Sequence, residues 1–158
     1  MQKKLFITWV THNSRYNEKM KLLKLEKKEW YFLDDNNRIF IYNLIYEKIK
    51  KEWIKNFTLN VLSDHVHLVL FYEKNNLSKL IKNIKWSVSF KYSKIKWFSR
   101  TWKWVQNKIW AKWYSITYLD TEEHHKKAIK YTLKNHEKHQ INNIYHLVNK
   151  ELWNTTEF

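Results

Sequence analysis

Two neighbouring segments with alternating side chains constrain the fold of this chain more than any other feature. Residues 57–62 and 65–71 each alternate as β-strands do, and the two residues between them can form a tight turn. The pattern predicts an antiparallel hairpin. His65 and His67 begin its second strand, and residues two apart lie on the same face of a sheet, so both imidazoles can share a metal ion.

The rest of the pattern predicts a single α+β sheet protein. Apolar residues recur at helical intervals, which predicts helices at 39–54 (with Trp53 on its apolar face), 76–95 and about 121–136. Strand patterns cover 5–11 and 114–119, and residues 96–113 lack a period and predict a long loop. This order resembles a ferredoxin-like or RRM-like sandwich, an antiparallel sheet backed by helices on one face. The other face would be free to build a site.

The charge balance indicates a polyanionic partner. A length of 158 residues suits a single domain over residues 1–158. Thirty Lys and Arg against 15 Asp and Glu give a net charge of +15, which favours nucleic acid over a membrane as the partner.

No apolar run approaches the ~20 residues that span a bilayer, and no signal-peptide core precedes the first strand, so we expect a soluble, cytoplasmic protein. Because the chain has no cysteine, a metal must be held by His, carboxylate, amide or water.

A tyrosine and an asparagine lie one turn apart in the helix predicted at 121–136. Tyr131 and Asn135 share a helix face, where the Asn135 amide oxygen could complete a metal site begun by His65 and His67. A tyrosine beside a divalent cation is a suitable nucleophile for phosphoryl transfer, and the covalent product conserves the energy of the broken backbone bond for rejoining. The alternative is that Tyr131 only packs in an amphipathic helix and that the histidine pair binds no metal.

Basic residues of the helix predicted at 76–95 and its surroundings form a candidate DNA surface. Single-stranded or hairpin DNA needs a groove that neutralises its phosphates, and each contact adds salt dependence. The DNA-binding residues that we predict are Arg15, Lys79, Lys82, Lys85, Lys91, Lys94 and Lys96. The alternative is a solvated surface in a Lys-biased proteome.

The remaining histidines are weaker candidates for the site. Four of them cluster with Glu and Lys on a polar helix, and we expect these to be solvated: His124, His125, His136 and His139. His12 follows the first strand and could approach the sheet face that carries the histidine pair.

The chain contains no Gly and no Pro but ten Trp. Several of these Trp stand in polar, Lys- and Ser-rich surroundings where a turn would ordinarily use glycine: Trp86, Trp97, Trp102, Trp104 and Trp113. One hypothesis is that the source organism reads the codon UGA as glycine, so that some positions written as Trp are Gly in the native protein. For the run 102–104, a base-stacking platform is the competing interpretation.

Two motifs resemble those of a known enzyme family. The run Asp64-His65-Val66-His67 resembles the HUH motif (His, hydrophobic, His) of single-tyrosine HUH transposases. The run 131–135 matches the Tyr-x-x-x-Asn pattern of the REP-associated tyrosine transposase branch. Further likeness at 10–15 and 109–114 extends the resemblance over nearly the whole chain, although the family carries glycine near 86 and 113, where this chain has Trp.

The resemblance implies a specific activity and specific partners. By position, His65, His67 and Asn135 would bind Mg²⁺ or Mn²⁺, and Tyr131 would form a 5′-phosphotyrosine with single-stranded DNA. The family fold is the HUH endonuclease fold. Its members are usually dimeric and recognise DNA hairpins that flank a mobile or repeated element. The other interpretation of the same scaffold is a nucleic-acid-binding module that has lost catalysis.

Overall fold

The structure, a computed structural model, describes residues 3–12, 14, 21–24, 32–73, 76–98 (without the side chains of 95–98) and 109–144. The helices and strands in chain order are β1 (Lys3–Thr11), α2 (Asp35–Lys51), β2 (Phe57–Val61), β3 (His65–Tyr72), α3 (Leu77–Phe98), β4 (Trp110–Tyr118) and α4 (Glu122–Lys138).

The four strands form one antiparallel sheet with the order β2-β3-β1-β4. The predicted hairpin is confirmed as β2 and β3. Register places Thr8 of β1 and Asn60 of β2 on either side of His67 in β3, so these three side chains form a row on one face of the sheet. The inner strand β3 therefore carries the histidine pair, and the inner strand β1 carries Thr8 directly beside His67.

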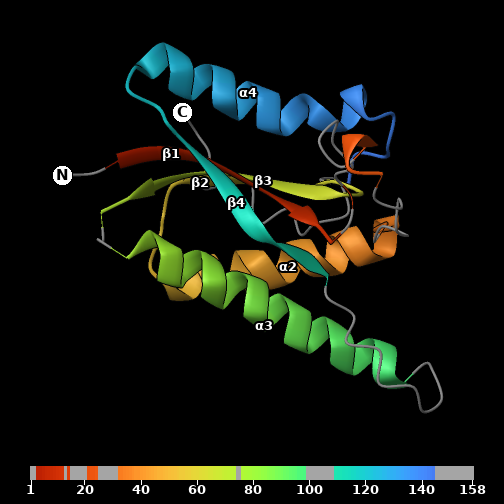
Figure 1. The fold of residues 1–158 in the computed structure, drawn as a ribbon. Helices are drawn as coiled ribbons and strands as arrows, with labels where there is room; N and C mark the ends of the chain where they lie inside the picture. Colours follow the sequence, from red (N-terminus) through yellow and green to blue (C-terminus); the bar gives the residue numbers. More distant parts are fainter. Residues whose placement is uncertain are drawn as a thin grey trace.

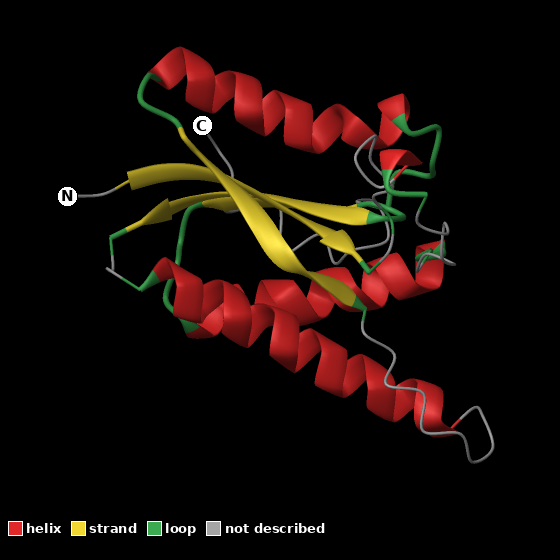
Figure 2. Ribbon diagram, in the orientation of Figure 1, coloured by secondary structure: helices red, strands yellow, loops and turns green. Residues whose placement is uncertain are grey.

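Helices cover both faces of the sheet (Figure 1). Helices α2 and α3 lie on one face and α4 lies on the other, with the strands between them (Figure 2). The α+β fold is as predicted, but the expectation that one face stays free of helices was wrong. The reason is a second, smaller apolar cluster, in which Ala128 and Ile129 of α4 pack with Val69 and Leu119. The site must therefore lie between α4 and the sheet.

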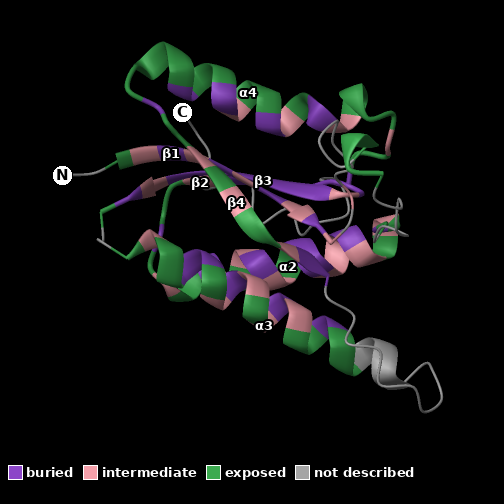
Figure 3. Cartoon of the chain, in the orientation of Figure 1, coloured by how far each residue is buried: buried purple, intermediate pink, exposed green. Residues whose placement is uncertain are grey.

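The main core lies on the α2 and α3 side. Ile41, Ile45 and Ile49 of α2 pack in one cluster with Leu68 and Leu70, which alternate with the histidines along β3. Strand β3 is consequently buried along almost its whole length (Figure 3). Burial on both faces explains why its sequence is apolar except where the histidines stand.

Both α2 and α4 begin at a capping side chain. Asp34 accepts a hydrogen bond of 2.8 Å from the Asn37 backbone nitrogen, and Thr121 accepts one of 3.1 Å from that of His124. Helix α2 thus begins four residues before the predicted start. Its first turn is polar and capped by Asp34, and a prediction from the spacing of apolar residues does not detect such a turn.

The C-terminal end of α2 corrects the prediction for Trp53. This residue lies beyond the helix, is 86% exposed and has φ 61°, the left-handed region. Its backbone nitrogen donates to the Lys50 carbonyl (2.9 Å), and that of Ile54 donates to the Ile49 carbonyl (3.4 Å). These two bonds define a Schellman motif, in which the left-handed residue is usually glycine.

The region predicted as a loop at 96–113 is partly regular structure. Helix α3 continues to Phe98, and β4 begins at Trp110, so the prediction was wrong at both ends. Trp86 and Trp113 lie in α3 and β4 rather than in turns, and both are exposed. The side chain of Trp97 and all of Trp102 and Trp104 lie outside the described residues.

Candidate active site

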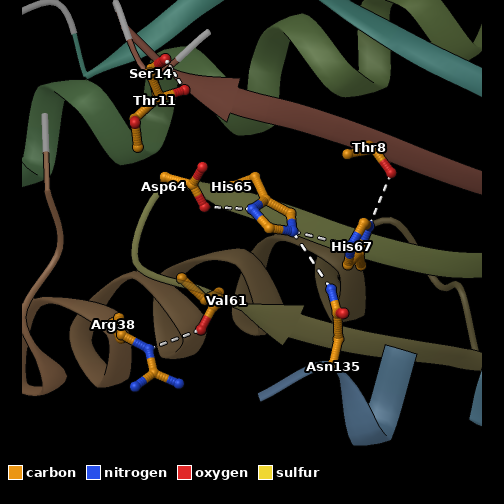
Figure 4. A network of polar contacts seen from close by, with 9 residues as sticks. All are labelled: Thr8, Thr11, Ser14, Arg38, Val61, Asp64, His65, His67 and Asn135. Atoms are coloured by element: carbon orange, nitrogen blue, oxygen red, sulfur yellow. Dashed lines mark hydrogen bonds and ion pairs between the residues drawn. The ribbon is translucent and has the colours of Figure 1, made fainter. Parts of the chain in front are cut away.

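The imidazole rings of the two histidines of β3 approach each other through their Nε2 atoms. His65 and His67 are buried on the face that α4 covers, and their Nε2 atoms are 3.0 Å apart. The Asp64 carboxylate accepts a hydrogen bond from His65 Nδ1, and the Thr8 hydroxyl is hydrogen-bonded to His67 Nδ1 at 2.8 Å (Figure 4). These partners of the two Nδ1 atoms fix the orientation of both rings, so that the Nε2 atoms point to the same place.

Helix α4 brings the other two predicted residues to this point. Asn135 is 2% exposed, and its Nδ2 lies 3.4 Å from His65 Nε2. Tyr131, one turn earlier, stands with its ring centroid 5.3 Å from that of His67 and is 42% exposed. The structure therefore brings together all four residues predicted for catalysis and metal binding, and Tyr131 is the one open to solvent.

A hydrogen bond from β2 holds α4 over the histidines. Asn60 is buried, and its Nδ2 donates to the backbone carbonyl of Thr132 at 2.7 Å. Thr132 follows Tyr131 directly, and Asn60 stands beside His67 in the sheet. This bond fixes the height and rotation of α4 at the point where Tyr131 and Asn135 face the sheet.

A cavity of about 290 Å³ opens next to the histidine pair. Its lining consists of Ser14, Asp64, His65, His67, Tyr131, Lys138 and His139. The ring centroid of His139 is 5.0 Å from that of His65, and Lys138 Nζ is 5.8 Å from the centre of the Tyr131 ring. The volume is just below the usual range of ligand sites, about 300–1,000 Å³.

The residues around the histidine pair fit a divalent cation. Two donor atoms about 2.1 Å from one ion and at right angles to each other stand about 3 Å apart, as the two Nε2 atoms do. The Oδ1 atom of Asn135 is buried with no hydrogen-bond partner among the described residues, and turning the amide over would bring this oxygen towards His65. No group of three or more His, Cys, Asp or Glu suited to a metal occurs in the described part of the chain. The amide would therefore be the third donor.

Comparison with known proteins identifies the family. Residues 14–136 match the sequence model described as "Transposase IS200 like", which is well over half of the chain. The chain belongs to the IS200-like transposase family. Membership of this family makes the chain a DNA-processing enzyme. A separate comparison with curated proteins gives no match.

Solved structures of transposases share the fold. One is a REP-associated tyrosine transposase bound to a REP hairpin, with a TM-score of 0.55 and 14% identity over 92% of this chain and 78% of that one. Another is a protein of Deinococcus radiodurans R1 named as a transposase, with a TM-score of 0.52 and 16% identity over 85% of this chain and 91% of that one. At such identities the likeness concerns the fold of the IS200-like transposase and not its substrate.

The lysines predicted to bind DNA are not at this site. Helix α3, which carries all of them, lies across the sheet from α4 (Figure 1). Lys79, Lys82, Lys91 and Lys94 are exposed there, whereas the side chain of Lys96 and the whole of Arg15 lie outside the described residues. A strand of DNA that contacts both α3 and the active site of this transposase must pass around the edge of the sheet.

Lys85 of α3 is engaged within the protein. Its ammonium donates to the backbone carbonyls of Ala111 (2.6 Å) and Lys112 (3.1 Å) in β4. Burial lowers the pKa of Lys85 to about 8. In this transposase, Lys85 therefore joins α3 to the edge strand.

One of the secondary histidines differs from expectation, and another, which is exposed as expected, lines the cavity. His125, expected in solvent, is buried at the other end of α4 against Phe71, with ring centroids 4.8 Å apart. His139 lines the cavity, which its position eight residues after Tyr131 on one helix side could have indicated. Among the described residues, His12 is not part of the cavity lining.

The sequence gives little sign of three other site residues. Thr8, Asn60 and Lys138 come from three different elements, and only the register of the sheet and the docking of α4 bring them to the histidines.

None of the described helices is long and apolar enough to cross a membrane.

Proposed function

We propose that this IS200-like transposase nicks and rejoins single-stranded DNA through a covalent bond to Tyr131. The observation that carries the proposal is the position of the Tyr131 ring, 5.3 Å from that of His67, where it lines one cavity together with the histidine pair. A nucleophile that is exposed beside buried, fixed imidazoles is what a nicking reaction requires.

In the proposed reaction, the Tyr131 hydroxyl loses its proton and its oxygen attacks a backbone phosphorus atom. The bond from phosphorus to the 3′-oxygen breaks, this oxygen takes up a proton, and the 5′ end of the downstream strand stays on Tyr131 as a phosphodiester. Attack by a 3′-hydroxyl on that phosphotyrosine reverses the step and joins two strands. No external energy source is needed, because one phosphodiester replaces another.

The histidine pair and Asn135 would hold the cation, Mg²⁺ or Mn²⁺. When bound, the ion polarises the phosphate and orients its oxygens. Asp64 and Thr8 keep the two rings turned towards each other, and α4 shields them from solvent. Burial of this polar cluster favours a fixed arrangement over a mobile one.

The substrate and the assembly are also part of the proposal. The structural relative bound to a REP hairpin supports a DNA hairpin as the substrate of this chain. The family resemblance supports a homodimer, and the absence of a long apolar run in the sequence supports a cytoplasmic location. The basic surface of α3 would hold DNA beyond the cavity.

The test is covalent capture with a pool of single-stranded hairpin oligonucleotides and Mn²⁺. DNA labelled at its 3′ end should become attached to the protein on a denaturing gel, while DNA labelled at its 5′ end should be released as a shorter fragment. Tyr131→Phe should abolish attachment and leave DNA affinity nearly intact, because the phosphate contacts elsewhere remain. Tyr118→Phe, at an exposed tyrosine outside the cavity, is the control and should retain activity. A wild-type protein that binds the pool but forms no adduct would instead be a DNA-binding module.

A further inference from the structure

Lys138 occupies a special place in the cavity. It is the last residue of α4, seven residues or about two turns after Tyr131, and therefore lies on the same side of the helix. Its ammonium is 5.8 Å from the centre of the Tyr131 ring, and its side chain lines the same cavity as the histidine pair. The Tyr131 ring thus has both His67 and the Lys138 ammonium within 6 Å.

The charge of the cavity lining distinguishes Lys138 from its neighbours. Among the described residues of the lining, it alone carries a permanent positive charge at neutral pH. Asp64 contributes a negative charge, but its carboxylate is turned to His65. An attacked phosphodiester gains negative charge on its non-bridging oxygens, and donors aimed at that charge lower the barrier.

We propose that Lys138 is a further catalytic residue, whose ammonium binds a non-bridging oxygen of the scissile phosphodiester while Tyr131 attacks. This inference rests on the proposed nicking reaction. It assigns the end of α4 as an anion subsite that faces the cation ligands across the phosphate. One oxygen is directed to the histidine pair and the other to Lys138, which leaves the phosphorus atom open to the Tyr131 oxygen.

The same helix offers a matched control. Lys130 is exposed on α4 but is not part of the cavity lining. Lys138→Met keeps an aliphatic side chain of similar length and removes the charge that lies near the tyrosine ring. Lys138→Arg restores a positive charge, and Lys130→Met removes one from the same helix away from the cavity.

The experiment measures the single-turnover rate of adduct formation with 3′-labelled hairpin DNA and Mn²⁺ at saturating DNA. Lys138→Met should slow the adduct by about 10²-fold, the usual cost of one lost oxyanion donor, with the Kd for DNA close to wild type. Lys138→Arg should recover most of the rate, and Lys130→Met should match wild type. A side chain that merely packs on Tyr131 would let Lys138→Met keep its rate.

The outcomes separate the two proposals. If the wild type forms the adduct and Lys138→Met is as fast as Lys130→Met, the role of Lys138 is overturned and the nicking reaction stands. If the wild type binds the DNA and forms no adduct, the reaction itself is absent and Lys138 has no catalytic role. Equal losses in Lys138→Met and Lys138→Arg would also contradict binding through charge.

Discussion

At the scale of single residues, Trp53 is the least expected feature of the chain. It occupies the left-handed position of the Schellman motif that ends α2, with φ 61° and a side chain that is 86% exposed. Because the Trp53 side chain is exposed, it contributes little burial energy at this position. Its positive φ carries a steric cost of about 1 kcal/mol or more. Glycine would occupy the position without this strain.

Trp53→Gly should therefore raise the free energy of unfolding by about 1 kcal/mol. Urea denaturation measures the change as a higher midpoint. Trp86→Gly is the contrasting variant, because Trp86 lies inside α3, where glycine costs roughly 1 kcal/mol. If Trp53→Gly also lowered the midpoint, the strain at this turn would be absent.

The same position tests the hypothesis that UGA is read as glycine. The mass of the peptide that contains residue 53, in protein from its native host, should be that of the glycine form. Trp86 and Trp113 lie in a helix and a strand, so the argument from turns that first singled them out does not apply to them. Trp9 and Trp110 are buried against each other, with ring centroids 6.2 Å apart, and should be tryptophan in the same protein. Tryptophan at residue 53 in the native peptide would refute the hypothesis there.

At the scale of elements, the position of α4 decides whether the site exists. Apolar contacts of Ala128 and Ile129 in the small cluster and of Leu133 with the main core hold α4 against the sheet, and the Asn60 bond to Thr132 fixes the helix near the histidines. Because the bond joins β2 directly to the residue after Tyr131, its loss should displace this proposed nucleophile more than it weakens the fold.

Asn60→Ala should lower stability by about 1 kcal/mol, the usual worth of one hydrogen bond. It should reduce the rate of adduct formation at saturating DNA by roughly tenfold to a hundredfold, because small errors in the position of a nucleophile are costly. Asn83→Ala, on α3 across the sheet, is the control. A variant that is less stable but reacts at the wild-type rate would restrict Asn60 to a structural role.

Sequence spacing predicts relations within an element better than relations between elements. The two histidines share a face because strands alternate, and Tyr131 and Asn135 share a face because helices turn every 3.6 residues. Spacing left the meeting of these two pairs as a possibility that the family resemblance then implied, and the bond from Asn60 to Thr132 spans 72 positions of sequence. Helix α4 was correctly predicted, but its place on the face expected to stay open depends on apolar contacts with Val69 and Leu119 that no local pattern encodes.

At the scale of the whole molecule, ion binding and folding should be coupled. The three proposed ligands come from β3 and α4, which are adjacent only in the folded chain. A ligand that binds only the folded state stabilises it by about 2.7 kcal/mol at a hundred times its Kd. Mn²⁺ should therefore raise the Tm, and EDTA should reverse the shift.

His67→Asn tests whether that shift comes from this site, because it removes one imidazole from the pair. The variant should lose the dependence of Tm on Mn²⁺ while K⁺ has no effect on either protein. A shift of equal size in the variant would assign the ion to another part of the chain.

The sheet order β2-β3-β1-β4 also governs how the chain opens to solvent. His65, His67 and Thr8 stand on the two inner strands, whose backbone amides have partners on both sides. Inner strands open last in native-state hydrogen exchange, whereas edge strands such as β4 fray at small cost. The amides of β3 should consequently exchange only with global unfolding. Fraying of the edge strands would then leave the arrangement of the two imidazoles intact.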